Sequence, residues 1–323
     1  MARNIVVSCL GPGRLAVDSD ASIDSALRAA RSQLQSSIEA VLPDRPDLII
    51  LPEACDRPDS FSLERRRDYF RAAGTANLDF ARLAARNNNC VIAFSTIREA
   101  GDHTWRNSTF VIDRKGDIAG SYDKNHVVIE ETTEAGILCG TEAPLIRLDF
   151  GTVACAICFD IQFDRLRLVY KALKPDLIIF SSRYHGGLNQ NLWAFSCRAW
   201  FAGAVAALPC SIVSPLGETV AASTMNVAQV TARINLDYAV VHLDHNLERF
   251  AAAKQRYGRA LAIHEPPDGY LDIALLTCES EEHTMAEIMR ECGLEPLDDY
   301  LARSLAWHAG AGDRGRGARA GDG

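Results

Sequence analysis

The chain has 323 residues, of which 48% are hydrophobic and 24% charged, a balance typical of a globular protein with a sizeable core. Its formal net charge of −8 argues against nucleic acid or an anionic membrane as the main partner, because both reward a basic surface. The N-terminal apolar run is too short for a signal peptide, and no apolar segment is long enough to span a bilayer. We therefore expect a cytoplasmic protein.

The ten cysteines are scattered singly along the chain, which favours reduced thiols over a disulfide framework. There is no paired CxxC pattern and no HExxH, so we expect no metal. Cys155 and Cys158 form one isolated CxxC. Residues three apart on a strand point to opposite faces, so these two thiols should not meet as a redox pair.

The first half of the chain alternates predicted strands and helices. The strands share continuous apolar runs and are Asn4–Leu10, Leu48–Leu51 and Cys90–Thr96. The helices share a three-to-four-residue apolar period and cover Ser22–Val41 and Leu78–Asn87. A hairpin is expected over Asn107–Ser121, because Gly116 in its turn can adopt the left-handed conformation that a tight turn requires.

The second half continues this alternation. The predicted strands are Leu145–Phe150, Thr152–Cys158, Asp176–Ser182, Cys210–Ser214 and Ala239–Asp244. The predicted helices are Leu166–Lys174 and Asn189–Ala207. Strand–helix–strand units mixed with hairpins indicate an α/β fold with mixed sheets and helices on their faces. We expect a single domain over residues 1–308, followed by a disordered tail over 309–323 that is rich in Gly, Ala, Arg and Asp.

Three reactive side chains follow predicted strands. Glu53 comes after Leu48–Leu51, Lys124 follows the hairpin, and Cys158 ends its strand. A thiol becomes a strong nucleophile only when it is deprotonated, and a carboxylate in a dry pocket can take the proton. An ammonium nearby stabilises negative charge that develops on a carbonyl oxygen. The three residue types therefore form a coherent set for nucleophilic catalysis, although each could separately be a core thiol, a surface acid or a solvated lysine.

Three motifs around these residues resemble those of the nitrilase, or carbon–nitrogen hydrolase, superfamily. They are Leu51-Pro-Glu53, Tyr122-Asp-Lys124-Asn-His126 and Ile157-Cys158-Phe-Asp160-Ile-Gln-Phe163. They occur in the family's order and at roughly its separations, and the resemblance covers about residues 4–245. It implies a four-layer α-β-β-α sandwich, no metal or organic cofactor, and homodimers or larger homo-oligomers.

The resemblance also implies roles for single residues. Glu53 is the general base, Lys124 the transition-state stabiliser and Cys158 the nucleophile, and the oxyanion lies between Lys124 and the Phe159 backbone N–H. A second glutamate is expected in the loop after the lysine. Glu134 is the best match in position, and Glu130 and Glu131 in the same loop remain alternatives.

The residues after the nucleophile favour an amide. Family nitrilases tend to have Trp-Glu there, whereas this chain has Phe159-Asp160, which looks more like the amidase and carbamoylase branches. Arg183 and Tyr184 follow the strand Asp176–Ser182, where the family's substrate loop lies. Arg183 is expected either to hold a substrate carboxylate or to pair with a nearby acid.

We therefore predict a hydrolase for a small linear amide or N-carbamoyl substrate, acting through a thioester on Cys158. A nitrilase and an amide acyltransferase of the same superfamily are the alternatives within enzymes. A catalytically silent binding or scaffold protein on the same fold is the alternative outside them, and the complete set of Glu53, Lys124 and Cys158 argues against it.

Overall fold

A computed structural model describes residues 2–266 and 271–317, with the backbone alone for 311–317. The chain divides into two compact units. The larger is Asn4–Leu236, and the smaller runs from Asp237 onward together with residues 1–3. Both six-stranded sheets lie within the larger unit, whereas the predicted strand Ala239–Asp244 lies in the smaller one.

Two six-stranded sheets form the centre of the larger unit. The first has the order β12 (Gln229–Asn235), β1 (Asn4–Leu10), β2 (Leu48–Ile50), β3 (Val91–Glu99), β4 (Trp105–Ile112), β5 (Ile118–Asp123). The second has the order β6 (Ile146–Leu148), β7 (Gly151–Ile157), β8 (Leu177–Ser182), β9 (Trp200–Val205), β10 (Ser211–Val213), β11 (Thr219–Ala222). Within each sheet, the five pairs of neighbouring strands, taken in the order given, are antiparallel, parallel, parallel, antiparallel and antiparallel.

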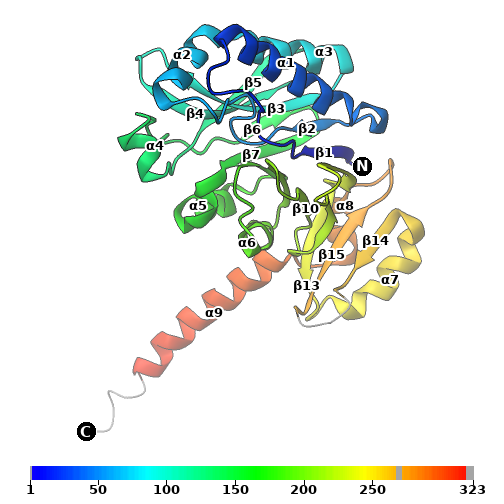
Figure 1. The fold of residues 1–323 in the computed structure, drawn as a ribbon. Helices are drawn as coiled ribbons and strands as arrows, with labels where there is room; N and C mark the ends of the chain where they lie inside the picture. The colour runs from blue at the N-terminus through cyan, green and yellow to red at the C-terminus, as the bar shows by residue number, and fades with distance from the viewer. Residues whose placement is uncertain (1, 267–270, 318–323) are drawn as a thin grey trace. The chain divides into compact units, whose positions relative to one another are not determined.

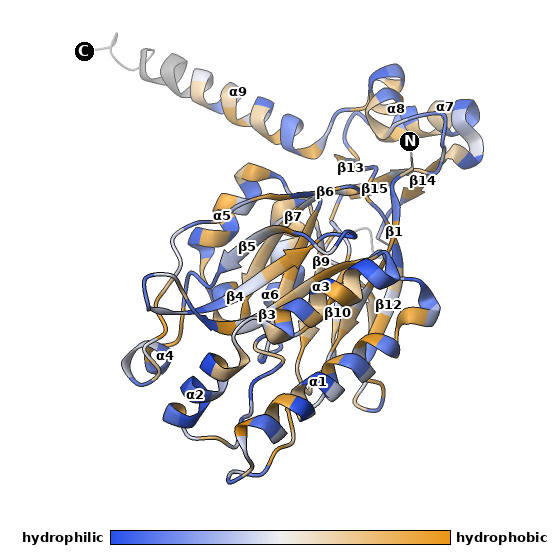
Figure 2. Ribbon diagram, turned by 90° about the horizontal axis from the view of Figure 1, so that it is seen from above, coloured by the Kyte–Doolittle hydropathy of each residue, from blue (hydrophilic) through white to orange (hydrophobic). Residues whose placement is uncertain are grey.

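Helices cover the outer face of each sheet, which gives four layers and confirms the predicted fold class (Figure 1). The helices on the side of the first sheet are α1 (Ile23–Glu39), α2 (Leu63–Ala73) and α3 (Ala76–Asn88). Those on the side of the second sheet are α5 (Asp164–Leu173) and α6 (Leu188–Cys197). Figure 2 shows the apolar strands between helices whose outward sides are hydrophilic.

Side-chain packing explains why the helices lie where they do. Leu34 and Ile38 of α1 recur at the spacing of one helical face, and they pack in one buried cluster with Ile49 and Ile92 of the first sheet. On the other side, the buried Tyr170 hydroxyl of α5 donates to the Cys155 carbonyl of β7 at 2.6 Å. Each sheet is therefore tied to its own helical layer.

The predicted hairpin is confirmed as β4 and β5. Gly116 in its turn has a φ of 82°, a conformation that side-chain-bearing residues rarely adopt. A Cβ at this position would lie 2.6 Å from the Arg82 carbonyl oxygen of α3. Glycine is thus required both by the turn and by the close approach of α3.

The predicted helix Asn189–Ala207 is wrong in its second half. The helix α6 ends at Cys197, where Arg198 adopts a left-handed conformation with a φ of 53°. Residues Trp200–Val205 instead form β9, which pairs in parallel with β8 and is buried on both faces. Alanine and glycine in this strand lack the β-branched pattern from which a strand is predicted, so the strand is determined by its place inside the sheet.

The smaller unit has its own sheet and core. Its antiparallel sheet has the order β13 (Tyr238–His242), β15 (Ile273–Cys278), β14 (Leu261–His264). Its helices are α7 (Leu247–Tyr257), α8 (Met285–Cys292) and α9 (Leu297–Gly317). Phe250, Leu276 and Ile288 belong to one buried cluster that joins α7, β15 and α8.

The C-terminal helix α9 runs to Gly317, past the start of the tail that the sequence predicted to be disordered from residue 309. A helix satisfies its backbone hydrogen bonds internally, so it can continue beyond its packed part. Residues 318–323 of that predicted tail lie outside the described residues. Within 2–266 and 271–317, no helix has the length and apolar composition needed to cross a bilayer.

Candidate active site

Glu53 and Lys124 meet at one edge of the first sheet. Glu53 follows β2 and Lys124 follows β5, and because β4 is antiparallel to both β3 and β5, the two strands end at the same edge. The Lys124 Nζ lies 2.9 Å from the Glu53 Oε1. Only 1% of Lys124 and 3% of Glu53 are exposed, so this ion pair is shielded from water.

A second carboxylate, that of Glu131, also forms an ion pair with Lys124. The Glu131 Oε2 lies 2.8 Å from the Lys124 Nζ and accepts the Val128 backbone N–H at 2.9 Å. This local bond is made at the start of the short helix α4 (Ile129–Thr133) and turns the carboxylate inward. The Asn107 Nδ2 donates to Glu53 at 2.8 Å and to Glu131 at 3.3 Å, so one amide holds both carboxylates.

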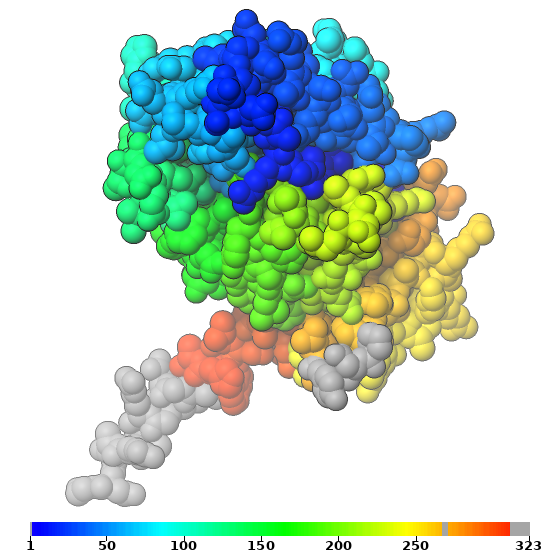
Figure 3. All heavy atoms as spheres, viewed as in Figure 1, coloured from blue at the N-terminus to red at the C-terminus, as the bar shows by residue number. Residues whose placement is uncertain are grey.

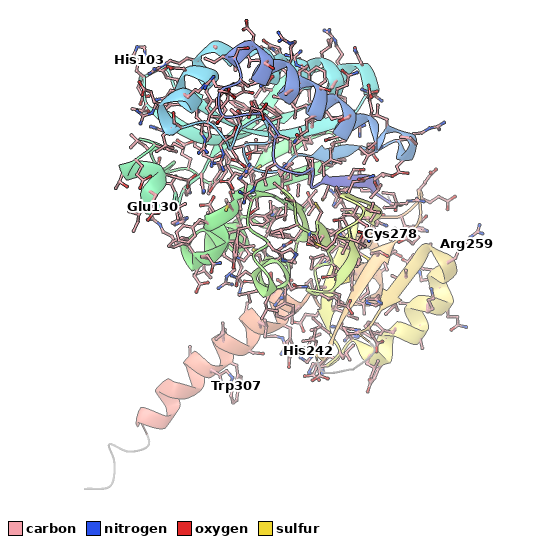
Figure 4. The ribbon with its side chains drawn as sticks, in the orientation of Figure 1. His103, Glu130, His242, Arg259, Cys278 and Trp307 are labelled. Atoms are coloured by element: carbon pink, nitrogen blue, oxygen red, sulfur yellow. The ribbon has the colours of Figure 1, made fainter. Side chains whose placement is uncertain are left out.

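The position chosen from the sequence, Glu134, is not part of this cluster. Glu134 caps the C-terminal end of α4 and is exposed. Glu130 is exposed as well, and Figure 4 shows it at the outer side of α4. Spacing alone could not separate the three glutamates, because the choice depends on which one bonds to the N-terminal turn of α4.

Cys158 lies where β7 passes into a short 3₁₀ helix, Cys158–Gln162. Its φ of 48° is unusual for a residue with a side chain, and such conformations gather at functional sites. The Ser182 side chain and the Arg183 backbone, both at the end of β8, lie close enough to this thiol to oppose part of the rise that burial causes in its pKa. Since β7 and β8 are parallel, the ends of two neighbouring strands meet at the sulfur.

The electrostatics of the cluster favour a neutral thiol beside an ionised glutamate. Burial and the Glu53 charge raise the pKa of Cys158 to about 12. Burial would raise the pKa of Glu53, but the Lys124 charge and hydrogen bonds from Lys124 and Cys158 lower it overall. The two carboxylates outweigh the burial of Lys124 and raise its pKa. Two carboxylates and one ammonium already leave one excess negative charge, so a thiolate would add a second.

Asp160 joins the loop of the lysine to the loop of the cysteine, a role that the sequence analysis missed. This carboxylate is 0% exposed. It accepts the Tyr122 hydroxyl at 2.7 Å, the His126 backbone N–H at 2.8 Å and the Ile157 backbone N–H at 3.0 Å. Its presence in the cysteine motif was visible in the sequence, but Tyr122 lies on β5 of the other sheet and His126 in the loop that follows β5.

The three predicted substrate residues have different surroundings. Phe159 follows the nucleophile in the first turn of the 3₁₀ helix, and its ring packs edge-on against Phe163 at 5.1 Å. Arg183 forms an ion pair with Asp59, so the expected pairing with a nearby acid is present. The Tyr184 side chain is 49% exposed, and its hydroxyl lies 3.4 Å from the Gln162 Nε2. The structure does not bring Tyr184 to the cluster.

Comparison with known proteins agrees with the fold. The family model described as carbon-nitrogen hydrolase matches residues 22–240, more than half of the chain. The chain therefore belongs to the carbon–nitrogen hydrolase family, which confirms the resemblance seen in the three motifs.

Three similar proteins illustrate the relationship. A "hydrolase in agr operon" of Staphylococcus lugdunensis is 30% identical over 47% of this chain and 65% of its own length. A chloroplastic omega-amidase of Arabidopsis thaliana is 25% identical over 68% of this chain and 66% of its own length. The chain thus spans slightly less than two thirds of both relatives. The structure of Saccharomyces cerevisiae Nit3, of the nitrilase superfamily, superposes with a TM-score of 0.60 at 17% identity, over 72% of this chain and 90% of that one.

Proposed function

We propose that this chain is a thiol hydrolase that cleaves the C–N bond of a small linear amide or N-carbamoyl compound. The observation that carries the proposal is the buried cluster in which Lys124 contacts Glu53 and Glu131, with Cys158 close enough to Glu53 for each to shift the pKa of the other. Base and charge stabiliser lie within hydrogen-bond distance of each other, and the nucleophile interacts electrostatically with both, as nucleophilic catalysis requires.

In the first half-reaction, the Cys158 sulfur attacks the carbonyl carbon. Because the pKa of Cys158 is raised to about 12 and that of Glu53 is lowered, a free thiolate is disfavoured. The thiol proton therefore moves to Glu53 as the C–S bond forms. The carbonyl oxygen takes up the negative charge beside Lys124 and the Phe159 backbone N–H. When the C–N bond breaks, Glu53 returns the proton to the leaving nitrogen, and a thioester remains on Cys158.

In the second half-reaction, water replaces the leaving amine. Glu53, ionised again, accepts a proton from water as the oxygen attacks the thioester carbon. Collapse of the second tetrahedral intermediate breaks the C–S bond, and the proton on Glu53 passes to the sulfur. Glu131 keeps Lys124 charged throughout, because it is the second carboxylate on the ammonium.

The direct test is removal of the nucleophile. Cys158→Ala should abolish ammonia release from amides and ureido compounds while the thermal unfolding temperature stays close to that of the wild type. Cys155→Ala is the matched control, because this buried thiol lies on β7, the strand that leads to Cys158. Full activity in Cys158→Ala would contradict the proposal.

A second measurement separates an enzyme from a silent protein on the same fold. A thiol-directed electrophile should label Cys158 far faster than the other nine cysteines, because Glu53 can accept its proton during attack. Equal labelling of all ten, read by mass spectrometry, would favour the silent protein.

The substrate panel should contain amides, ureido acids and nitriles, each with and without an amine acceptor. Nitrilases tend to have a tryptophan after the nucleophile, whereas this chain has Phe159. This difference supports amides and ureido acids as the substrates in the panel that are hydrolysed. Ammonia release from nitriles alone would indicate a nitrilase, and amide formation with the acceptor would indicate an acyltransferase.

We also propose that the chain forms homo-oligomers, as the family resemblance implies. Large apolar side chains are exposed on α5 and α6, among them Leu168 at 52% and Leu188 at 81%. Sedimentation velocity tests this directly, and a monomer at micromolar concentration would contradict it.

A further inference from the structure

A cavity of about 420 Å³ lies beside the joint between α2 and α3, within the larger unit. The residues that line it come from α2, α3, β3, β4, the joint itself and the segment between β2 and α2. Asp56, Phe94 and Thr96 of this lining are buried, whereas Gly74 and Thr75 at the joint are exposed. The cavity therefore opens to solvent at the joint and ends at buried side chains.

This cavity is separate from the reacting groups. The described residues that line it include no member of the cluster around Lys124 and Cys158. In Figure 3 the light-blue atoms of α2 reach the surface beside the cyan atoms of residues near 100, where Arg71 of α2 meets Glu99 of β3. A ligand in the cavity would thus bind without taking the place of a substrate carbonyl.

One carboxylate, that of Asp56, is held at the buried end of the cavity. The Thr96 hydroxyl donates to it at 2.9 Å and the Asn77 Nδ2 at 3.0 Å, and both donors are neutral. The Arg57 charge acts on Asp56, but the Arg57 Nε donates to Asp59 at 2.9 Å. A carboxylate can accept about four hydrogen bonds, so Asp56 keeps capacity for a further donor.

The two arginines of the lining already have partners. Arg71 pairs with Glu99 at 3.3 Å, and Arg98 donates to both Asp123 carboxylate oxygens, at 3.0 and 3.1 Å. Within residues 2–266 and 271–317, Asp56 is thus the charged side chain of this lining that no ion pair neutralises. Burial raises the pKa of Asp56 to about 6, so most of this group is ionised at pH 7.5.

Aromatic rings supply much of the apolar surface of the cavity. They belong to Phe70 of α2, Phe94 of β3 and Phe110 of β4, and Leu78 and Ile97 add aliphatic surface. Ring faces attract cations as well as apolar groups. A few polar groups among aromatic and aliphatic ones, in a volume of this size, are typical of a site for a small molecule. The lining therefore suits a molecule with one cationic end and an apolar body.

We propose that this cavity is a binding site for a small organic ammonium, whose nitrogen donates to Asp56 and whose apolar body lies against the three phenylalanine rings. A buried carboxylate that lacks a cation costs stability, and acids with such perturbed surroundings gather at functional sites. Thr96 and Asn77 hold the carboxylate in place before the ligand arrives, so its ordering does not oppose binding. The proposal stands apart from the hydrolase function.

The test uses three probes of similar size that differ in one group, namely benzylamine, benzyl alcohol and benzoate. Titration calorimetry of the wild-type protein at pH 7.5, where benzylamine is an ammonium, should show it binding at least about tenfold more tightly than benzyl alcohol. Benzoate should not bind, because its charge has the same sign as that of Asp56. Equal affinity for the amine and the alcohol, tighter binding of benzoate, or no binding of benzylamine at millimolar concentration would overturn the proposal.

Three variants locate the binding. Asp56→Asn keeps the shape of the side chain and removes its charge, so it should weaken benzylamine at least about tenfold and change benzyl alcohol by less than about threefold. Ala73→Leu fills the cavity from the last turn of α2 and should weaken both probes at least about tenfold. Asp24→Asn makes the same change in net charge at the exposed start of α1 and should leave both probes unaffected.

The pattern across these variants distinguishes this cavity from any other amine site. If benzylamine binds equally to the wild type, Asp56→Asn and Ala73→Leu, it lies elsewhere and the proposal falls. Thermal unfolding curves show whether each variant is folded at the temperature of the titration. If Ala73→Leu does not fold, the pair of Asp56→Asn and Asp24→Asn still decides. None of these measurements depends on whether an amide is hydrolysed, so the site and the proposed function can fail separately.

Discussion

Glu53 and Asp56 are two buried carboxylates only three residues apart, yet their electrostatic surroundings are opposite. Glu53 faces Lys124 and has a lowered pKa, even though burial alone would raise it. Asp56 receives hydrogen bonds from the neutral Asn77 side chain at 3.0 Å and from the Thr96 hydroxyl at 2.9 Å. Burial dominates there and raises the pKa of Asp56 to about 6.

The difference shows that burial does not by itself decide the charge of a carboxylate. Both side chains are almost fully covered, with exposed fractions of 3% for Glu53 and 2% for Asp56. A cation within hydrogen-bond distance offsets the cost of removing charge from water, whereas two neutral donors offset only part of it. Lys124 is therefore the residue that keeps the proposed base ready to accept a proton.

The largest effect is expected when the Lys124 ammonium is removed, because this cation is what separates the surroundings of Glu53 from those of Asp56. Lys124→Met would leave Glu53 and Glu131 buried together without a counter-charge. We expect a loss of about 3–5 kcal/mol of unfolding free energy and a fall in kcat of about 10³-fold. Urea unfolding at pH 7.5 and ammonia release measure the two effects.

The double variant Lys124→Met/Glu131→Gln sharpens this result. It removes one of the two unpaired charges, so part of the lost stability should return while activity stays low. Equal stability of wild type and Lys124→Met would show that the ammonium is not what keeps the buried carboxylates charged.

A smaller effect is expected where one of the lysine's two carboxylates is lost. Glu131→Gln keeps the shape of the side chain but removes its charge from Lys124, and we expect kcat to fall about 10- to 100-fold. Glu134→Gln is the matched control on the same short helix, and it should change kcat less than twofold because Glu134 is exposed. Steady-state ammonia release gives kcat for both variants. A larger fall in kcat for Glu134→Gln than for Glu131→Gln would contradict the assignment of Glu131.

The smallest effect concerns Asp56. Its pKa is about 6 in the folded state against an ordinary value near 4, so between these values the folded state binds more protons. The contribution of this group to stability therefore falls as pH rises through that window. Asp56→Asn should be more stable than wild type at pH 7.5, by on the order of 2 kcal/mol, and the difference should shrink at pH 5.

In Asp56→Asn, the side chains of Asn77 and Thr96 can each keep a hydrogen bond to residue 56. An asparagine oxygen can still accept from Asn77, and its amide can donate to the Thr96 hydroxyl, which rotates to accept. Urea unfolding at both pH values checks the prediction. A stability difference that is independent of pH would show that Asp56 does not titrate in this window.

Some of the site followed from the sequence because it depends on local order along the chain. Glu53, Lys124 and Cys158 each lie within three residues of the end of a strand, and a strand's end can be read from where its apolar run stops. Their roles remain a proposal. The meeting of Glu53 and Lys124 follows from the pairing of strands in the first sheet, whereas Cys158 belongs to the second sheet, and its approach depends on how the two sheets pack.

Other features depended on contacts that spacing does not encode. The choice of Glu131 over Glu134 rests on one hydrogen bond to the Val128 backbone. The strand β9 is rich in small residues, and only its place between β8 and β10 makes it a strand. The acid that pairs with Arg183 is Asp59, more than 100 positions earlier in the chain, so the sequence could not identify it.

The position of Asp160 has a consequence for redesign. This one carboxylate fastens Tyr122 and His126 on the lysine side to the end of the strand that carries the nucleophile. A variant that changes other loops around the site but keeps Asp160 should therefore leave the lysine loop and the nucleophile's strand joined as they are.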